Sequence, residues 1–444
     1  MQGNGLADCP PQIERLLELV SPRTGVVMRL DRVIRGADEP TPPVLYAARI
    51  SNYDFRRAPD IERGAAGKGL TEHAAIGGAI GEAVERYCAS HVDAARLRRT
   101  SLKEAPDGAL LPQELILFSK RQYASPGFPF SPATDDMAID WIAATEWLDD
   151  TACRVDAWVP AAAVYLHSDN VMPGNALFIG NSSGLAAGPD ADAALRSGLC
   201  ELIERDAFIA TWMNRLEPAR IIVDGGADAL TGIVAHYRRF DVDLQLYALD
   251  SDTGIPVVMA LALSERFDEP AAVVGLGCHL DANEAALRAA FEVCQVRPSQ
   301  VQHRRAPQRL TAAEVRGIED HSAYFAQHEV RHELDFICHS DRVVALSALP
   351  RLADGRAAAD LRTCIAALRR IGCQVFAIDL TTPDLLPYPI RVVRAIASGL
   401  QPIHFGYGMA RLGGTRLQRA AQQFHPELRV LSEDELNTCP HPLA

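Results

Sequence analysis

The chain mixes short apolar runs with longer segments in which apolar residues recur every three or four positions. The second pattern is typical of amphipathic helices and predicts them over residues 11–20, 71–91, 190–214, 227–239, 282–296 and 357–371. The short runs, rich in branched residues, predict strands over 26–32, 44–50, 176–179, 220–223, 244–249, 256–263, 271–276, 374–379 and 390–396. Because helices and strands interleave, the fold class is α/β or α+β.

Small and polar residues mark the predicted boundaries. Gly64–Gly69 is expected to be a glycine-rich turn, with Thr71 as the N-cap of the next helix, and a second turn is expected over residues 180–189. Residues 123–132, rich in proline and aromatics, predict a surface loop, or alternatively the lining of a substrate groove. No Pro/Gly/Ser linker divides the chain, so we expect one composite domain over residues 61–444, preceded by an N-terminal region over residues 1–60.

Composition narrows the class of protein. Of the 444 residues, 48% are hydrophobic, which suffices for a large core, and the formal charge of −13 disfavours binding to nucleic acid or to an anionic membrane. No apolar run is long enough to span a bilayer, and the N-terminus lacks a secretory signal. None of the ten cysteines forms a CxxC pair, so reduced thiols in a cytoplasmic protein are expected.

Two predicted helices carry nearly the same acidic signature. Residues 78–86 and 197–205 each place Glu, Glu and Arg at positions i, i+3 and i+4, and a third helix carries a related set; these residues are Glu82, Glu85, Arg86, Glu201, Glu204, Arg205, Glu292, Gln295 and Arg297. Carboxylates one turn apart repel unless a counter-ion lies between them. Mg²⁺ prefers carboxylate and phosphate oxygens, and arginine binds phosphate in a bidentate manner. The pattern indicates a magnesium–triphosphate site, and the alternative is a solvated acidic face closed by local Glu–Arg pairs.

Other motifs are weaker. His328 to His332 matches the HExxH zinc signature but lacks its continuation, and the single Glu329–His332 pair does not complete a four-helix di-iron site. Ser182 lies in a GxSxG pattern that no helix follows at once, as a nucleophile elbow requires. The segment around Lys68 is not a P-loop because its spacing is too short, although Lys68 could reach a phosphate or lie in solvent.

The ordered set of motifs resembles the YcaO family. The matching pieces are Gly67-Lys-Gly-Leu-Thr, Glu82-Ala-Val-Glu-Arg, Ser182-Ser-Gly-Leu-Ala-Ala-Gly, Glu201-Leu-Ile-Glu-Arg, Glu292-Val-Cys-Gln-Val-Arg, Arg391-Val-Val-Arg, Gly399-Leu-Gln-Pro and Arg411-Leu-Gly. The likeness runs from about residue 60 to 420 and is greatest to the discrete cyclodehydratases of thiazole- and oxazole-modified ribosomal peptides. It implies mixed sheets with helices packed around a central ATP and Mg²⁺ site, where ATP activates a peptide amide so that Cys, Ser or Thr closes an azoline ring.

The resemblance also implies roles for individual residues. Those expected to be magnesium ligands or their bridges are Glu82, Glu85, Glu201 and Glu204. Those expected to contact the nucleotide are Lys68, Arg86, Ser183, Ser197, Arg205, Glu292, Gln295 and Arg297. For Ser183 the alternative is a turn residue, and for Ser197 a small residue where two helices approach closely. Gly78, Pro189 and Ala193 depart from the usual family pattern, which leaves the number of metal ions open.

The C-terminus resembles a catalytic tail. Azoline-forming members often end in Pro-x-Pro-x-Pro, and here Pro440, Pro442 and Ala444 occupy those positions. A tail that enters the active site is therefore expected, and the alternative is a frayed terminus.

Partners follow from the same resemblance. They are a ribosomal precursor peptide, a separate ubiquitin-activating-like protein that binds its leader, a flavin-dependent azoline dehydrogenase and a second copy of the chain. Two other functions stay open: formation of a thioamide or amidine by the same amide activation, and a non-catalytic ATP-binding scaffold or assembly factor.

Overall fold

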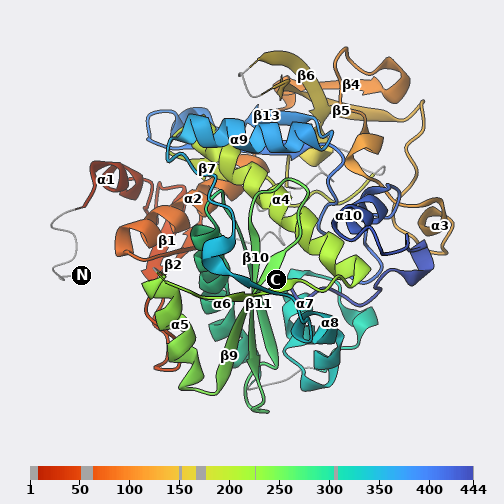
Figure 1. Ribbon diagram of the computed structural model, residues 1–444. Coiled ribbons are helices and arrows are strands. Elements are labelled where there is room, and N and C mark those ends of the chain that lie inside the picture. Colours follow the sequence, from red (N-terminus) through yellow and green to blue (C-terminus); the bar gives the residue numbers. More distant parts are fainter. Residues whose placement is uncertain are drawn as a thin grey trace.

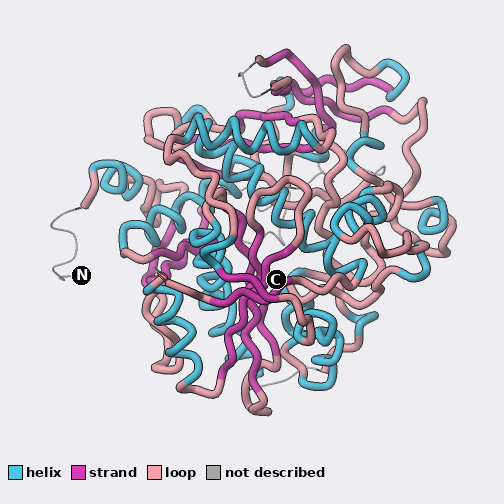
Figure 2. The backbone as a smooth tube through the Cα atoms, viewed as in Figure 1, coloured by secondary structure: helices cyan, strands magenta, loops and turns pink. Residues whose placement is uncertain are grey.

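The computed structural model describes residues 9–51, 64–149, 153–166, 177–225, 227–304 and 309–443. Its named strands form three sheets (Figures 1 and 2). One is antiparallel, in the order β1 (Val27–Arg32), β2 (Val44–Ile50) and β3 (Gly64–Gly69). It joins residues on both sides of the predicted boundary at residue 60.

The other two sheets are larger. One has the order β4 (Leu97–Ser101), β5 (Ala138–Trp147), β13 (Val375–Asp379), β14 (Arg391–Ala397) and β7 (Leu185–Gly188), with β6 (Arg154–Pro160) paired to β5. The other has the order β11 (Ala272–Cys278), β10 (Val257–Ser264), β9 (Val242–Leu249), β8 (Ala219–Ile222) and β12 (Val343–Ala345). Only the β8–β12 pairing among the described strands is parallel. The fold is therefore a mixed α+β architecture.

The α-helices pack on and between these sheets. They are α1 (Pro11–Leu17), α2 (Glu72–Ser90), α3 (Lys120–Tyr123), α4 (Ala191–Asn214), α5 (Asp228–Arg238), α6 (Ala282–Arg304), α7 (Ile318–Phe325), α8 (Asp335–Cys338), α9 (Ala357–Arg370) and α10 (Arg416–Phe424). The central one is α4, which contacts β7 and β14 of one sheet and β10 and β11 of another, with α9 packed over it (Figure 1). Its C-terminal half is buried from Asp206 to Asn214.

Three strand–helix units recur in the fold: β3–α2, β7–α4 and β11–α6. In each unit the helix folds back onto the strand that precedes it. The approach is so close that a Cβ atom on Gly67 would lie 1.9 Å from the carbonyl oxygen of Ala75, and one on Gly277 would lie 2.1 Å from that of Ala285. Only glycine fits at these two positions, because any side chain would force helix and strand apart.

Most predicted helices are confirmed, and two predicted turns are wrong. Thr71 caps α2 as expected, and Asp190 caps α4; each side chain accepts a hydrogen bond from a backbone N–H of the first turn. Gly64–Gly69 is a strand, because β2 pairs along its whole length and its glycines are needed for contact with α2. The strand expected at 176–179 is absent from the described residues 177–179, and β7 lies instead inside the expected turn at 180–189.

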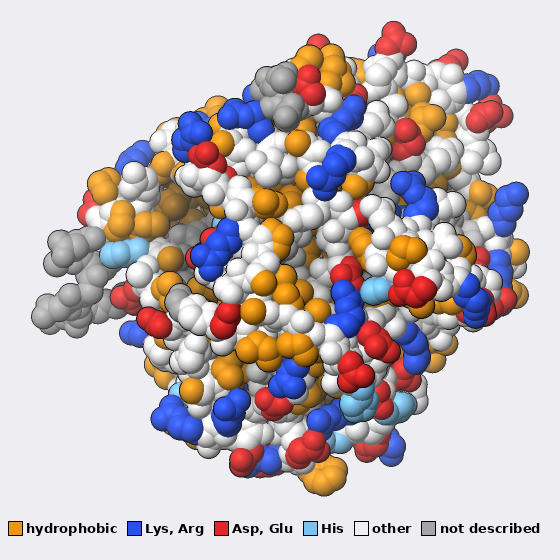
Figure 3. Space-filling model, in the orientation of Figure 1, with side chains coloured by type: hydrophobic (Ala, Val, Ile, Leu, Met, Phe, Trp, Pro, Cys, Tyr) orange, Lys and Arg blue, Asp and Glu red, His pale blue; other side chains and the backbone are white. Residues whose placement is uncertain are grey.

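The sequence patterns missed the hairpin-rich region of β4, β5 and β6, and α6 runs past residue 296 through Pro298 to residue 304. None of the ten cysteines forms a disulfide in this structure. Within the described ranges, no helix has the length and apolar character needed to cross a bilayer. On the face shown in Figure 3, acidic and basic side chains are interspersed and form no large basic patch.

Candidate functional site

A cavity of about 780 Å³ lies where the three strand–helix units meet. Its walls come from β3 and α2, from β7 and α4, and from β11 and α6. Each of the three helices directs glutamate side chains to it: Glu85 from α2, Glu201 and Glu204 from α4, and Glu292 from α6. Segments that are far apart in the chain thus bring their repeated acidic motifs to one place.

The first glutamate of each acidic motif accepts a hydrogen bond from the backbone of its own strand–helix unit. Glu82 accepts a hydrogen bond from the N–H of Ala66 at 2.8 Å, Glu201 from Gly184 at 2.7 Å, and Glu292 from Leu276 at 2.5 Å.

In two of these units the other carboxylate oxygen binds an arginine one turn later. The distances are 2.8 Å from Glu82 to Arg86 and 2.6 Å from Glu201 to Arg205. The two arginines therefore orient the glutamates, an arrangement that the repeated Glu-x-x-Glu-Arg spacing encodes directly.

The protein environment disfavours the ionised form of the second glutamates, Glu85 and Glu204. Glu85 accepts a hydrogen bond from the N–H of Ala187 at 2.6 Å, yet burial, with Glu82 and Glu201 nearby, raises its pKa well above the ordinary value. Burial raises the pKa of Glu204 to about 8, and the neighbouring carboxylates of Glu292 and Glu201 contribute. Like charges in a desolvated site stay ionised only when a cation joins them.

The donor set fits magnesium bound together with phosphate rather than a metal held by protein alone. In the part of the chain that the structure describes, no group of three or more His, Cys, Asp or Glu side chains is placed to hold a metal ion by itself. Mg²⁺ usually takes one or two carboxylates and completes its octahedron with substrate phosphates and water. Carboxyl groups whose ionised form is disfavoured, facing a large cavity, match that mode of binding.

Cationic and hydroxyl side chains complete the cavity. Lys68 on β3 and Arg288 on α6 line it, and neither has an ion pair with a described carboxylate. Ser197 on α4 also lines it, as predicted. Arg288 was not among the predicted site residues, although its position one turn before Glu292 places both on the same face of α6.

Several predicted site residues lie elsewhere. Arg297 does not line the cavity: it is 2% exposed and binds Asp38, Glu39 and Glu269. The prediction that it contacts the nucleotide is corrected, because three carboxylates already occupy its guanidinium.

Other predicted residues also do not line this cavity. Gln295 is also outside its walls, and Arg86 is engaged by Glu82. Arg205 and Ser183 contact each other and line a second, smaller cavity on another side of α4.

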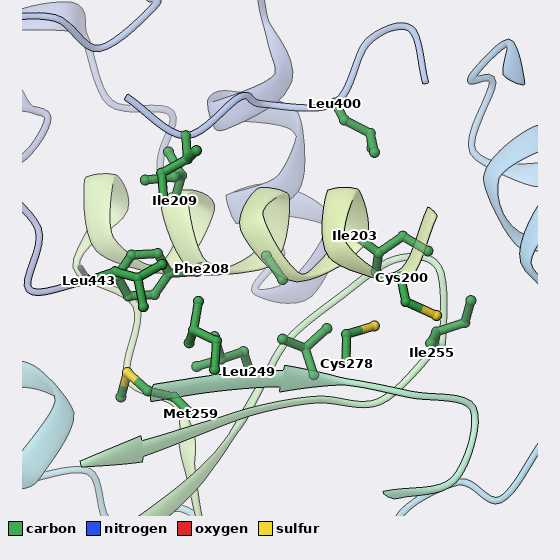
Figure 4. Close-up of a cluster of buried hydrophobic side chains, with 14 of the residues drawn as sticks. Cys200, Ile203, Phe208, Ile209, Leu249, Ile255, Met259, Cys278, Leu400 and Leu443 are labelled. Carbon is green, nitrogen blue, oxygen red and sulfur yellow. The ribbon is translucent and has the colours of Figure 1, made fainter. Parts of the chain in front are cut away.

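The C-terminal segment runs along α4 toward the acidic residues. The N–H of Asn437 donates to the carbonyl of Met213 at 2.8 Å, and the indole N–H of Trp212 donates to the carbonyl of Cys439 at 2.9 Å. The His441 ring then lies 5.6 Å from that of Phe208, which is one turn beyond Glu204. Pro440 and Pro442 are buried, and Leu443 lies beside Phe208 (Figure 4). Ala444 lies outside the described residues.

The competing motifs do not form sites. His328 and His332 are on a 3₁₀-helix, where residues four apart do not share a face. His328 Nε2 lies 3.0 Å from the carbonyl of Arg266, and His332 Nδ1 lies 3.0 Å from that of Glu329. Ser182 precedes β7 rather than a helix, so it has no nucleophile-elbow geometry.

Comparison with known proteins agrees with this geometry. The family model described as YcaO cyclodehydratase, ATP- and Mg²⁺-binding, matches residues 66–401. A protein of Methanothermobacter thermautotrophicus, described only as uncharacterized, is 31% identical over 353 residues, covering 77% of this chain and 84% of its own. An uncharacterized protein of the tfuA 3′ region of Rhizobium leguminosarum bv. trifolii is 34% identical over 169 residues, which are 36% of this chain and 39% of its own.

Solved structures share the fold. A heterocyclase in complex with substrate and cofactor has a TM-score of 0.80 at 24% identity; the match covers 98% of this chain but 58% of that one. The YcaO protein of Methanopyrus kandleri, bound with AMPPCP and Mg²⁺, has a TM-score of 0.62 at 23% identity, covering 87% of this chain and 89% of that one. The cavity, its repeated glutamates and the matched family model agree: the chain belongs to the YcaO family.

Proposed function

We propose that the protein is an ATP-dependent peptide cyclodehydratase. The observation that carries this proposal is the convergence of Glu85, Glu201, Glu204 and Glu292, from three helices, on one cavity large enough for a nucleotide. The heterocyclase fold supports it as well. An amide oxygen is a poor leaving group, and a site that holds a triphosphate beside a peptide makes it a good one by phosphorylation.

The side chains of the cavity have two roles, contact with the phosphates and positioning of the glutamates. Lys68, Arg288 and Ser197 contact the phosphates, and Arg86 and Arg205 hold Glu82 and Glu201 in place. The glutamates of the acidic cavity would hold Mg²⁺, which would supply positive charge to offset the negative charge that develops during phosphoryl transfer. Fixed glutamates and arginines supply positioning, which is the main contribution of a protein to this chemistry.

The reaction balances without a further reactant. The thiol or hydroxyl of Cys, Ser or Thr adds to the preceding amide carbonyl, and the carbonyl oxygen takes the γ-phosphoryl group of ATP. Loss of that oxygen as inorganic phosphate, with the amide proton, leaves an azoline ring and ADP. The peptide ring thus forms with the net loss of one water.

The C-terminal segment and the partners are part of the same proposal. The segment that contains Pro440 and Pro442 packs along α4 through Asn437, Cys439 and His441, and we assign it a role in the reaction. A separate leader-binding protein, a flavin azoline dehydrogenase and a second copy of the chain remain proposed partners. A microcin synthetase complex of Escherichia coli, solved with a bound pro-peptide, has a related fold at a TM-score of 0.55 and supports a multi-protein assembly.

The test is a reconstituted reaction with a Cys/Ser/Thr-rich peptide encoded beside this gene, its proposed partner, ATP and Mg²⁺. Mass spectrometry should show the loss of one water per ring together with ATP consumption. Glu201→Gln keeps an acceptor for the N–H of Gly184 but removes the charge, and should abolish both signals. Glu319→Gln, an exposed position on α7, is the matched control and should leave both unchanged.

Other outcomes identify the alternatives. Exchange of oxygen for sulfur or nitrogen in the peptide would indicate a thioamide- or amidine-forming enzyme. A partner function that survives Glu201→Gln with no turnover in the unaltered protein would indicate a scaffold. If ring formation is unaffected by deletion of residues 440–444, the tail has no role in the reaction.

A further inference from the structure

Arginines gather around a second cavity beside α4, next to the acidic cavity. A cavity of about 80 Å³ lies between α4, β14 and the segment before β7, and we call it the arginine pocket after Arg205, Arg394 and Arg411, which line it. These residues come from α4, from β14 and from the segment that follows β14. No motif in the sequence predicts their convergence.

Arg394 is buried and forms no ion pair with a described carboxylate, although the charge of Glu201 acts on it from a distance and that of Arg205 opposes it. Its side chain is 4% exposed, and Nη2 donates to the carbonyl of Asn181 at 2.8 Å. Its Nε and Nη1 have no hydrogen-bond partner among the described residues. Burial lowers the pKa of Arg394 to about 10, because the charged form is poorly solvated there. The two free N–H directions are therefore available to an acceptor in the pocket.

Arg411 is also buried and also lacks an ion-pair partner among the described residues. Its guanidinium lies 4.1 Å from the ring centroid of Phe178, and Nη2 is 3.4 Å from the carbonyl of Ile179. Burial lowers its pKa to about 10 as well. Within the described ranges, no carboxylate forms an ion pair with Arg394 or Arg411.

The protein neutralises its other fully buried arginines. Arg416, at 5% exposure, binds Asp206 and Asp252, and Arg297 binds three carboxylates. Leaving one buried charge unpaired costs several kcal/mol, so two unpaired charges at one cavity indicate a site for an anion that arrives from outside.

The side chains that line the pocket determine which kind of anion it can bind. They are largely apolar and include Leu115, Phe178, Leu202, Ile396, Leu400 and Ile403. A strongly hydrated inorganic ion gains little from such walls, whereas an organic carboxylate buries its carbon atoms against them. Arginine also matches the planar carboxylate with two parallel hydrogen bonds.

A neighbouring cavity extends this surface. It has a volume of about 210 Å³, shares Arg411 with the arginine pocket and is lined by Phe118 and Phe130, whose rings stack 4.7 Å apart. A ligand that spans both cavities would bury apolar groups on the aromatic side chains and place its charge beside Arg411 and Arg394.

We propose that the arginine pocket binds a carboxylate carried on an apolar chain. The source that we infer is the peptide substrate, through an Asp or Glu side chain or its C-terminal carboxylate next to an apolar residue, and this part rests on the proposed function. Arg205 joins the pocket to the acidic site, because it also binds Glu201 there. The pocket would thus position a peptide whose reacting amide lies toward the glutamates.

The binding test uses the full chain without ATP or Mg²⁺, so a wrong assignment of the reaction would not affect it. The probes are N-acetyl-leucine, the α-amide of N-acetyl-glutamate, N-acetyl-leucinamide and inorganic phosphate, titrated with NMR detection. One or both carboxylates should bind, which also distinguishes a terminal from a side-chain group, while the amide and phosphate should bind at least tenfold more weakly. Equal binding of the amide or of phosphate would overturn the proposal.

Variants locate the probe. Arg394→Met should weaken carboxylate binding at least tenfold, and Arg362→Met, at an exposed position on α9, should leave it unchanged. Carboxylate binding that survives Arg394→Met would overturn the site. If the probes bind only after deletion of residues 440–444, the chain's own end is the occupant and the inference of an external ligand is wrong.

Thermal unfolding gives a second, independent readout. Arg394→Met removes an unpaired buried charge, so the ligand-free variant should unfold at a higher temperature than the unaltered protein. A merely structural arginine would have the opposite effect. A lower unfolding temperature, or a variant that fails to fold, would show that the protein itself neutralises Arg394 and would contradict the proposal.

Discussion

The two sides of α4 face buried groups of opposite charge type, and on each side two of these groups form no ion pair with another described residue. Toward α2 and α6, Glu85 and Glu204 are buried carboxyls whose pKa values are raised. Toward β14, Arg394 and Arg411 are buried guanidinium groups whose pKa values are lowered. Both shifts have the same first cause, the loss of solvation of the charged form.

Elsewhere the protein pairs its buried charges, as the contacts of Arg416 with Asp206 and Asp252 show. This difference between paired and unpaired buried charges indicates where ligands bind. Structural charges have fixed partners within the fold, whereas binding sites leave a charge of one sign for a ligand to neutralise. A cation bound with phosphates would neutralise the glutamates on one side of α4. An organic carboxylate would neutralise the arginines on the other side.

The largest expected effect is on catalysis. Glu204→Gln removes one of the unbalanced carboxyls from the acidic cavity, and we expect ATP turnover to fall roughly 10³-fold, as when a fixed electrostatic contact to a transition state is lost. The ligand-free variant should nevertheless be at least as stable as the unaltered protein, because a neutral amide replaces a buried carboxyl whose ionised form is disfavoured. Steady-state kinetics and denaturant unfolding measure the two effects. A variant that is both active and unstable would mean that Glu204 is structural.

The next effect concerns the paired charges. Arg416→Met leaves Asp206 and Asp252 without their counter-ion, so the free energy of unfolding should fall by about 3–5 kcal/mol. The matched change on the unbalanced side, Arg394→Met, should not lower it. Urea unfolding monitored by circular dichroism compares the two variants. If both lose stability equally, the distinction between paired and unpaired buried arginines does not hold.

The smallest effect is the response of the ligand-free protein to pH. Because the pKa of Glu204 is raised to about 8, the native state holds a proton that the unfolded chain has already lost above its ordinary pKa. The free energy of unfolding should therefore fall by roughly 1–2 kcal/mol between pH 6.5 and 8.5, and level off above that range.

Between about pH 6.5 and 8.5 the buried histidines do not contribute to the change in stability. His321, His404 and His441 have lowered pKa values, so they remove stability only as the pH falls below about 6.5. Glu204→Gln should flatten the slope above pH 6.5. A slope that is unchanged in this variant would assign the effect to another group.

Local patterns in the sequence were sufficient to predict those parts of the site that lie within a single helix. The i, i+3, i+4 spacing placed Glu82, Glu85 and Arg86 on one face, and the Glu82–Arg86 pair forms as that spacing requires. The cap residue Thr71 fixed where α2 begins. These features depend on neighbours within a turn or two, so periodicity and side-chain chemistry predict them.

Contacts between distant segments decided the rest. Arg288 and Arg297 are both arginines of α6, yet only Arg288 lines the cavity, because packing sets which part of the helix faces it. The glycines at 64–69 suggested a turn, and pairing with β2 made them a strand. The arginine pocket joins three elements that no local pattern connects.

The sequence by itself therefore determined the repeated acidic helices, the cap of α2 and the family resemblance. These features depend only on residues that are close together in the chain. Only the tertiary structure decided which carboxylates are desolvated, which arginines lack a partner and that both groups share α4. Burial and the balance of charge are properties of the packed molecule, since they depend on every segment that surrounds a side chain.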